Sequence, residues 1–460
     1  MSQSIKSPFS FAQVCVQATL VALSLGAFLA PALSTTPKTE RSVQPIVKQQ
    51  AHPTRAVDVL EDSPKAVVDE VWQIVNNEFV DKGFNHTDWL AKRQDLLSQH
   101  YENRQQAYKA IAQALKELDD PYTRFLDPDN FAMLTNQTSG EMSGVGLRLV
   151  LDKRTSDLKV LEPIKNSPAM KAGIQPDDRI VRINGKPAAL MNLDQASQEI
   201  QGEVGTEVNL QIARQGKGVF NVVLKRAQIE LDSVSYTVNQ EGPLRVGYIR
   251  LDEFSSHSAE QMKLAIEDLN KKKISGYVLD LRGNPGGLLF ASVDIARMWL
   301  KKGEIVSTID RKGGDRHFSA NGTEITNLPL VILVNQGSAS ASEILTGALK
   351  ENGRATIVGT TTYGKGLVQS VHSLSDGSGL AVTIARYYPP SGTDINHKGI
   401  SPDVYLDLSV DEQLRLRNDP TLIGTNADPQ YIKAIAVLQH YSSNLSQPIT
   451  SPKPVGALPE

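Results

Sequence analysis

The pattern of apolar and polar positions divides the chain into stretches with different periodicity. Apolar residues recur at the spacing of one helix face over 66–80 and again over 104–118, where the pattern stops before Pro121. From about Ser143 the apolar runs become short and are separated by turns, which is typical of strands. These predicted strands are 145–151, 158–164, 179–183, 208–212 and 219–224, with a helical stretch at 193–200. The sequence therefore predicts a helical N-terminal region that is followed by a small β-rich domain.

Strand and helix patterns alternate in the next region, about 229–410. Continuous apolar runs predict buried strands, and helical patterns lie between some of them. The strands are expected at 246–251, 276–281 and 328–334, and the helices at 259–270 and 291–300. This β-α-β order predicts an α/β core that is built as a layered sheet. Residues 431–438 predict a C-terminal helix, and we expect a mobile tail from Ser442, where Ser and Pro are frequent.

The first 32 residues have the pattern of a secretory signal peptide. Lys6 is the only charged residue before Lys38, the most apolar stretch is 20–33, and Ala-Pro-Ala stands near its end at 30–32. A helix needs about 20 predominantly apolar residues to span a bilayer, so a retained membrane anchor is the weaker alternative. We expect cleavage after Ala32 and a soluble lumenal or periplasmic protein.

The composition of the 460-residue chain excludes several classes of protein and of catalytic site. Hydrophobic residues make up 40% and charged residues 22%, which is typical of a folded soluble protein and excludes disorder for most of the chain. Lys and Arg number 48 and Asp and Glu 51, so there is no basic excess for binding nucleic acid. The one cysteine, Cys15, lies in the predicted signal peptide. A mature chain without thiols excludes cysteine-protease chemistry and thiolate zinc sites.

The β-rich segment contains two motifs that narrow its identity. A glycine-bearing loop opens a strand, and Ser-Pro-Ala at 167–169 leads to Asp-Arg-Ile-Val-Arg-Ile-Asn-Gly at 178–185. The segment resembles a PDZ domain of the circularly arranged type found in exported proteases. The resemblance implies that the loop binds the terminal carboxylate of a peptide, which adds as a strand to the sheet edge; a hairpin glycine pair without a ligand is the alternative. The candidate contacts are Gly144, Val145, Gly146, Leu147 and Arg179.

A serine-rich turn follows the predicted strand 328–334. The run 338–342, Ser-Ala-Ser-Ala-Ser, lies between this strand and a helix-forming stretch, 344–350. Small residues at such a turn let the backbone approach closely, and a helix N-terminus offers unpaired N–H groups beside a serine oxygen. Helix N-capping is the alternative, although it accounts for one serine rather than three. The turn by itself leaves catalysis and capping about equally favoured.

A serine nucleophile needs a base, and none of the eight histidines lies in a recognisable protease motif. The run 283–287, Gly-Asn-Pro-Gly-Gly, is similar to a trypsin-like motif, but Pro285 occupies the nucleophile position. The sequence also lacks H-E-x-x-H, so we expect no catalytic metal. Lys365 lies between two glycines and close to apolar residues, and it is the candidate base if burial lowers its pKa. A solvated loop lysine is the alternative.

Four motifs together resemble the carboxyl-terminal processing peptidases, also called tail-specific proteases. They occur in the family's order at 118–126, 280–287, 335–347 and 360–370. The resemblance implies that Ser340 is the nucleophile, Lys365 the base and Gln369 the residue that orients the lysine. It also implies an oxyanion hole; its expected donors are the N–H of Ala341 and that of either Gly286 or Gly287.

The same resemblance implies an exported serine endopeptidase that cleaves near the C-terminus of protein substrates and uses no cofactor. The similarity is greatest to cyanobacterial and chloroplast members, some of which mature the photosystem II reaction-centre precursor in the thylakoid lumen; others act on periplasmic proteins. We expect substrates with exposed apolar C-termini, including membrane-proximal ones, and no nucleic acid partner. The alternative is a non-catalytic PDZ scaffold or chaperone that binds exposed C-termini.

These expectations divide the chain into six segments. Their predicted boundaries and contents are 1–32 (signal peptide), 33–60 (linker), 61–137 (helical region), 138–228 (PDZ-like domain), 229–410 (α/β protease core) and 411–460 (C-terminal helical segment and tail).

Overall fold

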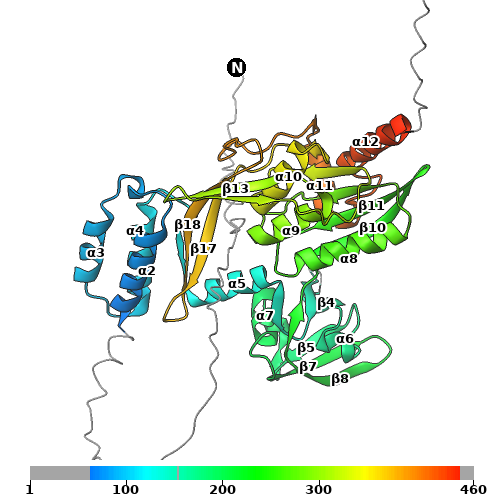
Figure 1. The fold of residues 1–460 in the computed structure, drawn as a ribbon. Coiled ribbons are helices and arrows are strands. Elements are labelled where there is room, and N and C mark those ends of the chain that lie inside the picture. The colour runs from blue at the N-terminus through cyan, green and yellow to red at the C-terminus, as the bar shows by residue number, and fades with distance from the viewer. Residues whose placement is uncertain (1–62, 153–154, 446–460) are drawn as a thin grey trace, which may run out of the picture. The chain divides into compact units, whose positions relative to one another are not determined.

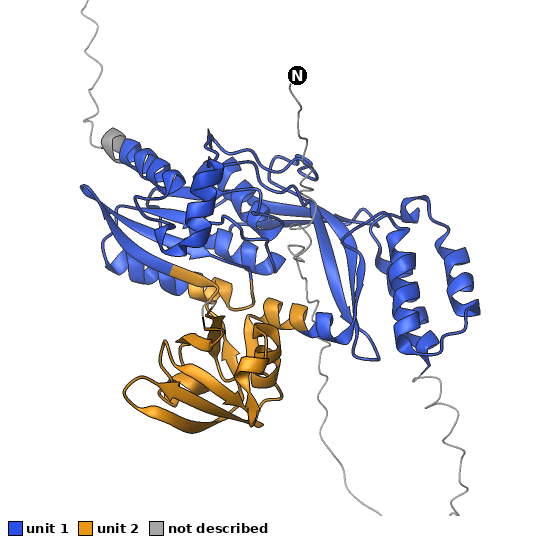
Figure 2. Cartoon of the chain, turned by 180° about the vertical axis from the view of Figure 1, so that it is seen from behind, with its two compact units in different colours: residues 1–132, 236–254, 263–460 blue, residues 133–235, 255–262 orange. Residues whose placement is uncertain are grey.

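The computed structural model describes residues 63–152 and 155–445, with side chains up to 441. The predicted signal peptide, the whole of the predicted linker and the last residues of the tail lie outside these ranges. The chain forms two compact units (Figure 2): residues up to 132, 236–254 and from 263 onward make unit 1, and residues 133–235 and 255–262 make unit 2. The chain leaves unit 1, builds most of unit 2 and returns.

Unit 1 begins with the helical region that the sequence predicts. Its helices are α2 (Pro64–Glu78), α3 (Trp89–Ser98) and α4 (Arg104–Lys116). Each begins at a side chain that accepts a hydrogen bond from a first-turn N–H, and these N-caps are Ser63, Asp88 and Asn103. Apolar faces of α2 and α4 pack together around Trp72 and Trp89. The helix α3 was not predicted from the apolar periodicity, because it buries only Trp89 and Leu96.

A six-stranded sheet forms the centre of unit 1 (Figure 1), with strand order β10-β11-β12-β15-β16-β19. Its strands are β10 (Val234–Glu241), β11 (Leu244–Leu251), β12 (Gly276–Asp280), β15 (Leu330–Val334), β16 (Thr356–Gly359) and β19 (Val404–Tyr405). The neighbours from β11 to β19 run parallel. All residues of β12 and β15 are buried, which is why these strands appear in the sequence as continuous apolar runs.

Helices cover both faces of this sheet, so the predicted layered α/β core is confirmed. The helices are α8 (Ser258–Lys271), α9 (Leu289–Trp299), α10 (Ala341–Glu351), α11 (Val410–Asn418) and α12 (Pro429–Leu445). Tyr431, Ala434, Ile435 and Leu438 of α12 pack on the face that carries Val278. Tyr277, on the opposite face, stacks edge-on against Trp299 of α9. The helix α12 continues to Leu445, past Ser442, where the sequence predicted the tail to begin.

A second, antiparallel sheet of unit 1 was not predicted from the sequence. Its strands are β1 (Arg124–Leu126), β13 (Glu304–Asp310), β14 (Asp315–Ser319), β17 (Leu367–Ser373) and β18 (Gly379–Tyr388). The hairpin of β17 and β18 reaches the helical region, where Leu374, Leu380 and Val382 join the cluster formed by α2 and α4. The Tyr108 hydroxyl donates a hydrogen bond of 2.6 Å to Asp376 at the hairpin turn. The helical region therefore holds the hairpin in place.

Unit 2 contains a separate small sheet with strand order β3-β4-β5-β7-β8 and its own apolar core. Its strands are β3 (Leu147–Leu151), β4 (Leu158–Pro163), β5 (Arg179–Ile183), β6 (Lys186–Pro187), β7 (Glu207–Arg214) and β8 (Gly218–Lys225). Its helices are α6 (Pro168–Lys171) and α7 (Leu193–Ile200), after α5 (Pro128–Ser139) at the boundary between the units. The segment before β3 and the segment after β8 pair with each other as a two-stranded antiparallel ladder, which consists of β2 (Glu141–Gly144) and β9 (Ala227–Glu230).

Replacing Leu380 by Ala should test how much the helical region stabilises the hairpin. Leu380 is fully buried in the shared cluster, so the cavity should cost about 3 kcal/mol of unfolding free energy. Leu90→Ala on α3 is the matched control, because Leu90 is 63% exposed and should change stability by less than about 0.5 kcal/mol. Urea denaturation of both variants measures the difference. Equal midpoints would show that the cluster does not stabilise the hairpin.

Candidate active site

Ser340 lies at the sharp turn between β15 and α10, and its backbone is strained. Its φ of 54° and ψ of −115° fall in a region that a residue with a side chain rarely adopts. The residue is fully buried, and its Oγ has no hydrogen-bond partner within the described part of the chain. The hydroxyl therefore does not cap α10, and the N-capping alternative does not explain this serine. A strained strand-to-helix turn with an unengaged hydroxyl is the usual geometry of a serine nucleophile.

The other two serines of the run hold the turn in place. The Ser338 Oγ donates 2.8 Å to the Leu281 carbonyl and accepts 3.0 Å from the Asn335 N–H. The Ser342 Oγ donates 2.8 Å to the carbonyl of Asn284. Both serines are buried, so these bonds attach the Ser340 turn firmly to the glycine-rich turn at 283–287.

The glycine-rich turn approaches Ser340 so closely that only glycine fits. A Cβ on Gly286 would lie 2.9 Å from the Ser340 Cβ and 3.0 Å from the Ala341 nitrogen. Gly286 uses its N–H in a 2.9 Å hydrogen bond to Asn284 Oδ1. The N–H groups of Gly287 and Ala341 have no acceptor among the described residues. The structure therefore leaves Gly287, rather than Gly286, with a free donor beside the N-terminus of α10.

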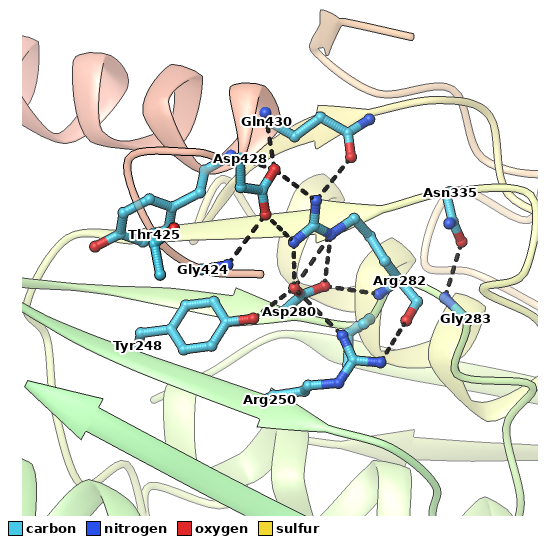
Figure 3. Close-up of polar contacts among 12 residues, drawn as sticks. Tyr248, Arg250, Asp280, Arg282, Gly283, Asn335, Gly424, Thr425, Asp428 and Gln430 are labelled. Atoms are coloured by element: carbon cyan, nitrogen blue, oxygen red, sulfur yellow. Dashed lines mark hydrogen bonds and ion pairs between the residues drawn. The ribbon is translucent and has the colours of Figure 1, made fainter. Parts of the chain in front are cut away.

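A buried ionic network supports the start of this turn (Figure 3). Arg282 lies between Asp280 and Asp428, with its Nη2 2.7 Å from Asp428 Oδ2, and the Tyr248 hydroxyl donates 2.7 Å to Asp280. Burial alone would raise the pKa of Asp280, but the charges of Arg282 and Arg250 hold it below its usual value. The network fixes the residue that directly precedes Gly283 and ties it to the segment before α12.

Lys365 lies between β16 and β17 and is only 2% exposed. Its Nζ is 4.6 Å from the centre of the Tyr122 ring. Burial lowers the pKa of Lys365 to about 7; the charge of Arg124 acts in the same direction, whereas Asp120 and Glu343 act against it. The alternative of a solvated loop lysine is therefore wrong.

Glu343 connects the two turns, and the sequence analysis did not identify it as a site residue. Its Oε2 accepts hydrogen bonds of 2.9 Å from the N–H groups of both Ser340 and Lys365. Its Oε1 accepts 2.6 Å from the Thr362 hydroxyl and 2.7 Å from the Gly364 N–H. The backbone nitrogens of Ser340 and Lys365 thus lie within two hydrogen-bond lengths of each other. Burial raises the pKa of Glu343, and these bonds oppose that effect.

Gln369 is fully buried on β17, four residues after Lys365. Its Nε2 donates a 3.2 Å hydrogen bond to Thr383 Oγ1 on β18. Its Oε1 has no hydrogen-bond partner among the described residues. The amide is thus held by its nitrogen and retains an unused acceptor oxygen.

The predicted peptide-binding loop of unit 2 leads into β3, which stands at one end of its sheet. Gly146 has a φ of 75°, and its Cβ would lie 2.2 Å from Ser167, so this position requires glycine. The N–H groups of Val145 and Gly146 have no acceptor in the described ranges. The structure does not bring Arg179 to this loop. Arg179 pairs with Lys159 at the opposite end of β4 from Leu147, and its guanidinium contacts Asp157 at 3.1 Å.

No group of three or more His, Cys, Asp or Glu side chains among residues 63–152 and 155–445 is placed to hold a metal ion. No helix within them is long and apolar enough to cross a membrane.

Comparison with known proteins places this geometry in a family. Residues 245–406 match the model of peptidase family S41, and residues 159–214 match a PDZ domain. The chain is 41% identical over 391 residues to the carboxyl-terminal-processing protease of Synechocystis sp.. The aligned region covers 83% of this chain and 90% of that protein. It is 40% identical over 356 residues to the chloroplastic C-terminal processing peptidase of Tetradesmus obliquus, covering 74% and 77%.

A solved structure is similar over most of this chain. The photosystem II D1 C-terminal processing protease is 39% identical, covers 80% of this chain and 99% of its own, and superposes with a TM-score of 0.50. The fold and the site together define a serine peptidase with a PDZ domain. The chain belongs to peptidase family S41.

Replacing Glu343 by Gln should reduce peptidase activity although the side chain keeps its shape. The amide has one acceptor oxygen in place of two, and its NH2 group would face N–H or hydroxyl donors. We expect kcat/KM for peptide cleavage to fall by about 100-fold or more, because misplaced reacting groups lose rate steeply.

Glu351→Gln, at the exposed end of the same helix, is the control and should retain wild-type kcat/KM. Circular dichroism would establish that both variants are folded. A fully active Glu343→Gln enzyme would show that the carboxylate does not align the two turns.

Proposed function

We propose that this protein is an exported Ser–Lys endopeptidase that cleaves protein substrates near their C-termini. One observation carries the proposal: a buried serine whose hydroxyl has no partner among the described residues and a buried lysine both donate their backbone N–H groups to the same carboxylate, that of Glu343. Relatives that are about 40% identical carry names that describe processing at the carboxyl terminus.

In this proposal the reaction is acyl transfer. Neutral Lys365 accepts the proton of the Ser340 hydroxyl while the oxygen attacks the peptide carbonyl. The Lys365 ammonium then protonates the departing amine, and water repeats the sequence on the acyl-enzyme. The pKa of about 7 leaves much of the lysine neutral at physiological pH, as a base requires. The free Oε1 of Gln369 is assigned to orienting the lysine.

The oxyanion formed during attack would be held by two backbone donors. We assign these to the N–H groups of Ala341 and Gly287, because Gly286 already donates to Asn284. Ala341 is the first residue of α10, so the positive end of the helix dipole adds to the stabilisation.

The PDZ domain would select substrates by their free C-terminus. The unpaired N–H groups of Val145 and Gly146 are placed to bind a terminal carboxylate, and the open edge of β3 can accept a peptide as an added strand. Gly144 and Leu147 flank this pair, whereas Arg179 is left out because it lies at the other end of β4. We expect apolar C-termini on the substrates.

The cellular context is assigned by likeness to relatives. We place the protein in the periplasm or the thylakoid lumen, with the signal peptide removed after Ala32. The similar solved structure is named for processing of photosystem II D1, and a membrane-proximal precursor of that kind is our first candidate substrate. The alternative function, a non-catalytic scaffold that binds exposed C-termini, would need neither a buried lysine nor a strained serine. The buried Lys365 and the strained Ser340 therefore favour the peptidase over the scaffold.

Replacing either dyad residue by Ala should abolish cleavage. Ser340→Ala removes the nucleophile and Lys365→Ala the base, so kcat should fall by about 10⁴-fold or more in each case. Ser391→Ala and Lys398→Ala, both at exposed positions, are the matched controls and should cleave normally. The assay follows a peptide with an apolar, free C-terminus by mass spectrometry. Full activity in Ser340→Ala or Lys365→Ala would exclude the dyad.

Amidation of the substrate's C-terminus should weaken recognition by the PDZ domain. An amide has no negative charge for the loop's N–H groups, so we expect kcat/KM to fall by about tenfold or more. The same peptide with an acetylated N-terminus is the control and should be cleaved as well as the free peptide. Equal rates for the amide and the acid would contradict selection by the terminal carboxylate.

A further inference from the structure

A cavity of about 250 Å³ lies within unit 1 and has no role in the reaction as proposed. One of its walls is formed by residues of β13, β14, β17 and β18, the strands of the antiparallel sheet. Residues that pair directly across an antiparallel ladder point to the same face of the sheet. Thr308 of this wall pairs with Tyr387, and Asp310 pairs with Ala385. The wall is therefore the face of the sheet that carries Tyr387.

This face of the sheet reaches the turn that holds the nucleophile. Tyr387 is buried, and its hydroxyl donates a 3.1 Å hydrogen bond to the Ser340 carbonyl. Val368, which lines the cavity from β17, directly precedes Gln369 in the chain. The cavity thus borders the same part of the sheet that contacts the reacting groups.

Another wall of the cavity is the start of α9, which follows the glycine-rich turn. Leu289 and Phe290 line the cavity there, and Leu289 is only two residues after Gly287, whose N–H is assigned to the oxyanion. The Phe290 ring stands edge-on to the ring of Phe318 on β14, with 5.8 Å between the ring centres. Both walls therefore lead to the point where the attacked carbonyl would bind.

Most of the lining is apolar. Leu289, Val368 and Ala385 are buried, whereas Phe290 is 44% exposed. An exposed aromatic ring beside buried aliphatic groups offers a contact surface for an apolar side chain of a ligand. The apolar residues that line the cavity are Leu289, Phe290, Phe318, Val368, Ile384 and Ala385.

The charged residues of the lining leave two cations without a partner. The Glu78 carboxylate lies 2.9 Å from His372 Nε2, and the Asp310 carboxylate accepts hydrogen bonds from N–H groups of its own turn. Lys312 and Arg316 are exposed and form no ion pair within the described part of the chain. The rim of the cavity therefore has positive charge to offer to a ligand.

We propose that this cavity is the subsite for the substrate residue whose carbonyl Ser340 attacks, and that it selects an apolar side chain with an acidic residue next to it. The inference rests on the proposed function, since it takes Ser340 as the nucleophile and Gly287 as an oxyanion donor. A carbonyl oxygen at the Gly287 N–H places the adjoining side chain at the Leu289 wall. A neighbouring carboxylate of the substrate then pairs with Lys312 or Arg316 at the rim.

Peptide cleavage by the full-length protein tests the apolar selection. The peptides share one free apolar C-terminus and differ only in the residue before the cut, which is Leu, Asn or Ala, and mass spectrometry follows their cleavage. Leu and Asn are similar in shape but differ in polarity, so we expect kcat/KM to be about tenfold or more higher for Leu than for Asn.

Replacing Phe318 by Ala removes part of the apolar wall. We expect kcat/KM for the Leu peptide to fall by about fivefold or more, and that for the Ala peptide to change by less than about twofold, because Ala does not fill the cavity. Ile309→Ala is the matched control, since Ile309 lies between Thr308 and Asp310 on β13 and points to the other face of the sheet. This control should preserve the ratio of the two values.

A second set of peptides, with Glu, Gln or Lys next to the apolar residue, tests the basic rim. We expect kcat/KM to decrease in the order Glu, Gln, Lys over a range of about fivefold, because exposed charges interact weakly. The double variant Lys312→Glu/Arg316→Glu should reverse this order. Lys271→Glu/Lys302→Glu, at exposed positions outside the cavity, makes the same change of net charge and should preserve it.

The outcomes separate the subsite from the proposed function. If Ser340→Ala cleaves these peptides as the wild type does, the proposed function fails. If cleavage requires Ser340 but the Leu and Asn peptides are cleaved equally, the subsite alone is overturned. An equal fall for the Leu and Ala peptides in Phe318→Ala would also overturn it, because the loss would then follow a structural change. An unchanged order of Glu, Gln and Lys in Lys312→Glu/Arg316→Glu would exclude selection by the rim.

Discussion

The arrangement of the active site depends on one buried carboxylate. Glu343 is fully enclosed and accepts hydrogen bonds from Ser340, Thr362, Gly364 and Lys365, so it joins the turn after β15 to the loop after β16. Neighbouring parallel strands bring the two turns to the same edge of the sheet, but strand pairing alone does not set their separation. The Glu343 carboxylate sets this separation, because its two oxygens accept four hydrogen bonds and each bond fixes the position of one donor.

Around this bridge, the architecture places polar chemistry in a dry environment. The ionic network of Asp280, Arg282 and Asp428 fixes the glycine-rich turn from one side, and the helical region holds the β17–β18 hairpin from another. Lys365 lies between these supports and is excluded from water. Exclusion from water makes the amine a base near neutral pH, and it also strengthens every charge that remains nearby.

The sequence predicted the parts of the molecule whose packing leaves a periodic pattern. The buried strands β12 and β15 and the helices α2 and α4 appear as apolar runs or faces, and their layered arrangement follows from their order. The antiparallel sheet was missed because its pairings join distant segments, such as β1 with β18, which no local pattern records. Ser340 and Lys365 were proposed as site residues through motif resemblance. Glu343 was missed although a Glu three residues after a serine is the known spacing of a capping box.

The strained backbone of Ser340 has a consequence for how this sequence can change over time. A left-handed backbone and a buried hydroxyl without a partner both raise the free energy of the folded state, by about 1–3 kcal/mol for strain of this kind. Selection for stability alone would favour glycine at this position and would remove the reactive oxygen. Only selection for catalysis opposes that drift. A relative that retains the fold but has been released from cleaving peptides would therefore be expected to lose this serine early and to become more stable by losing it.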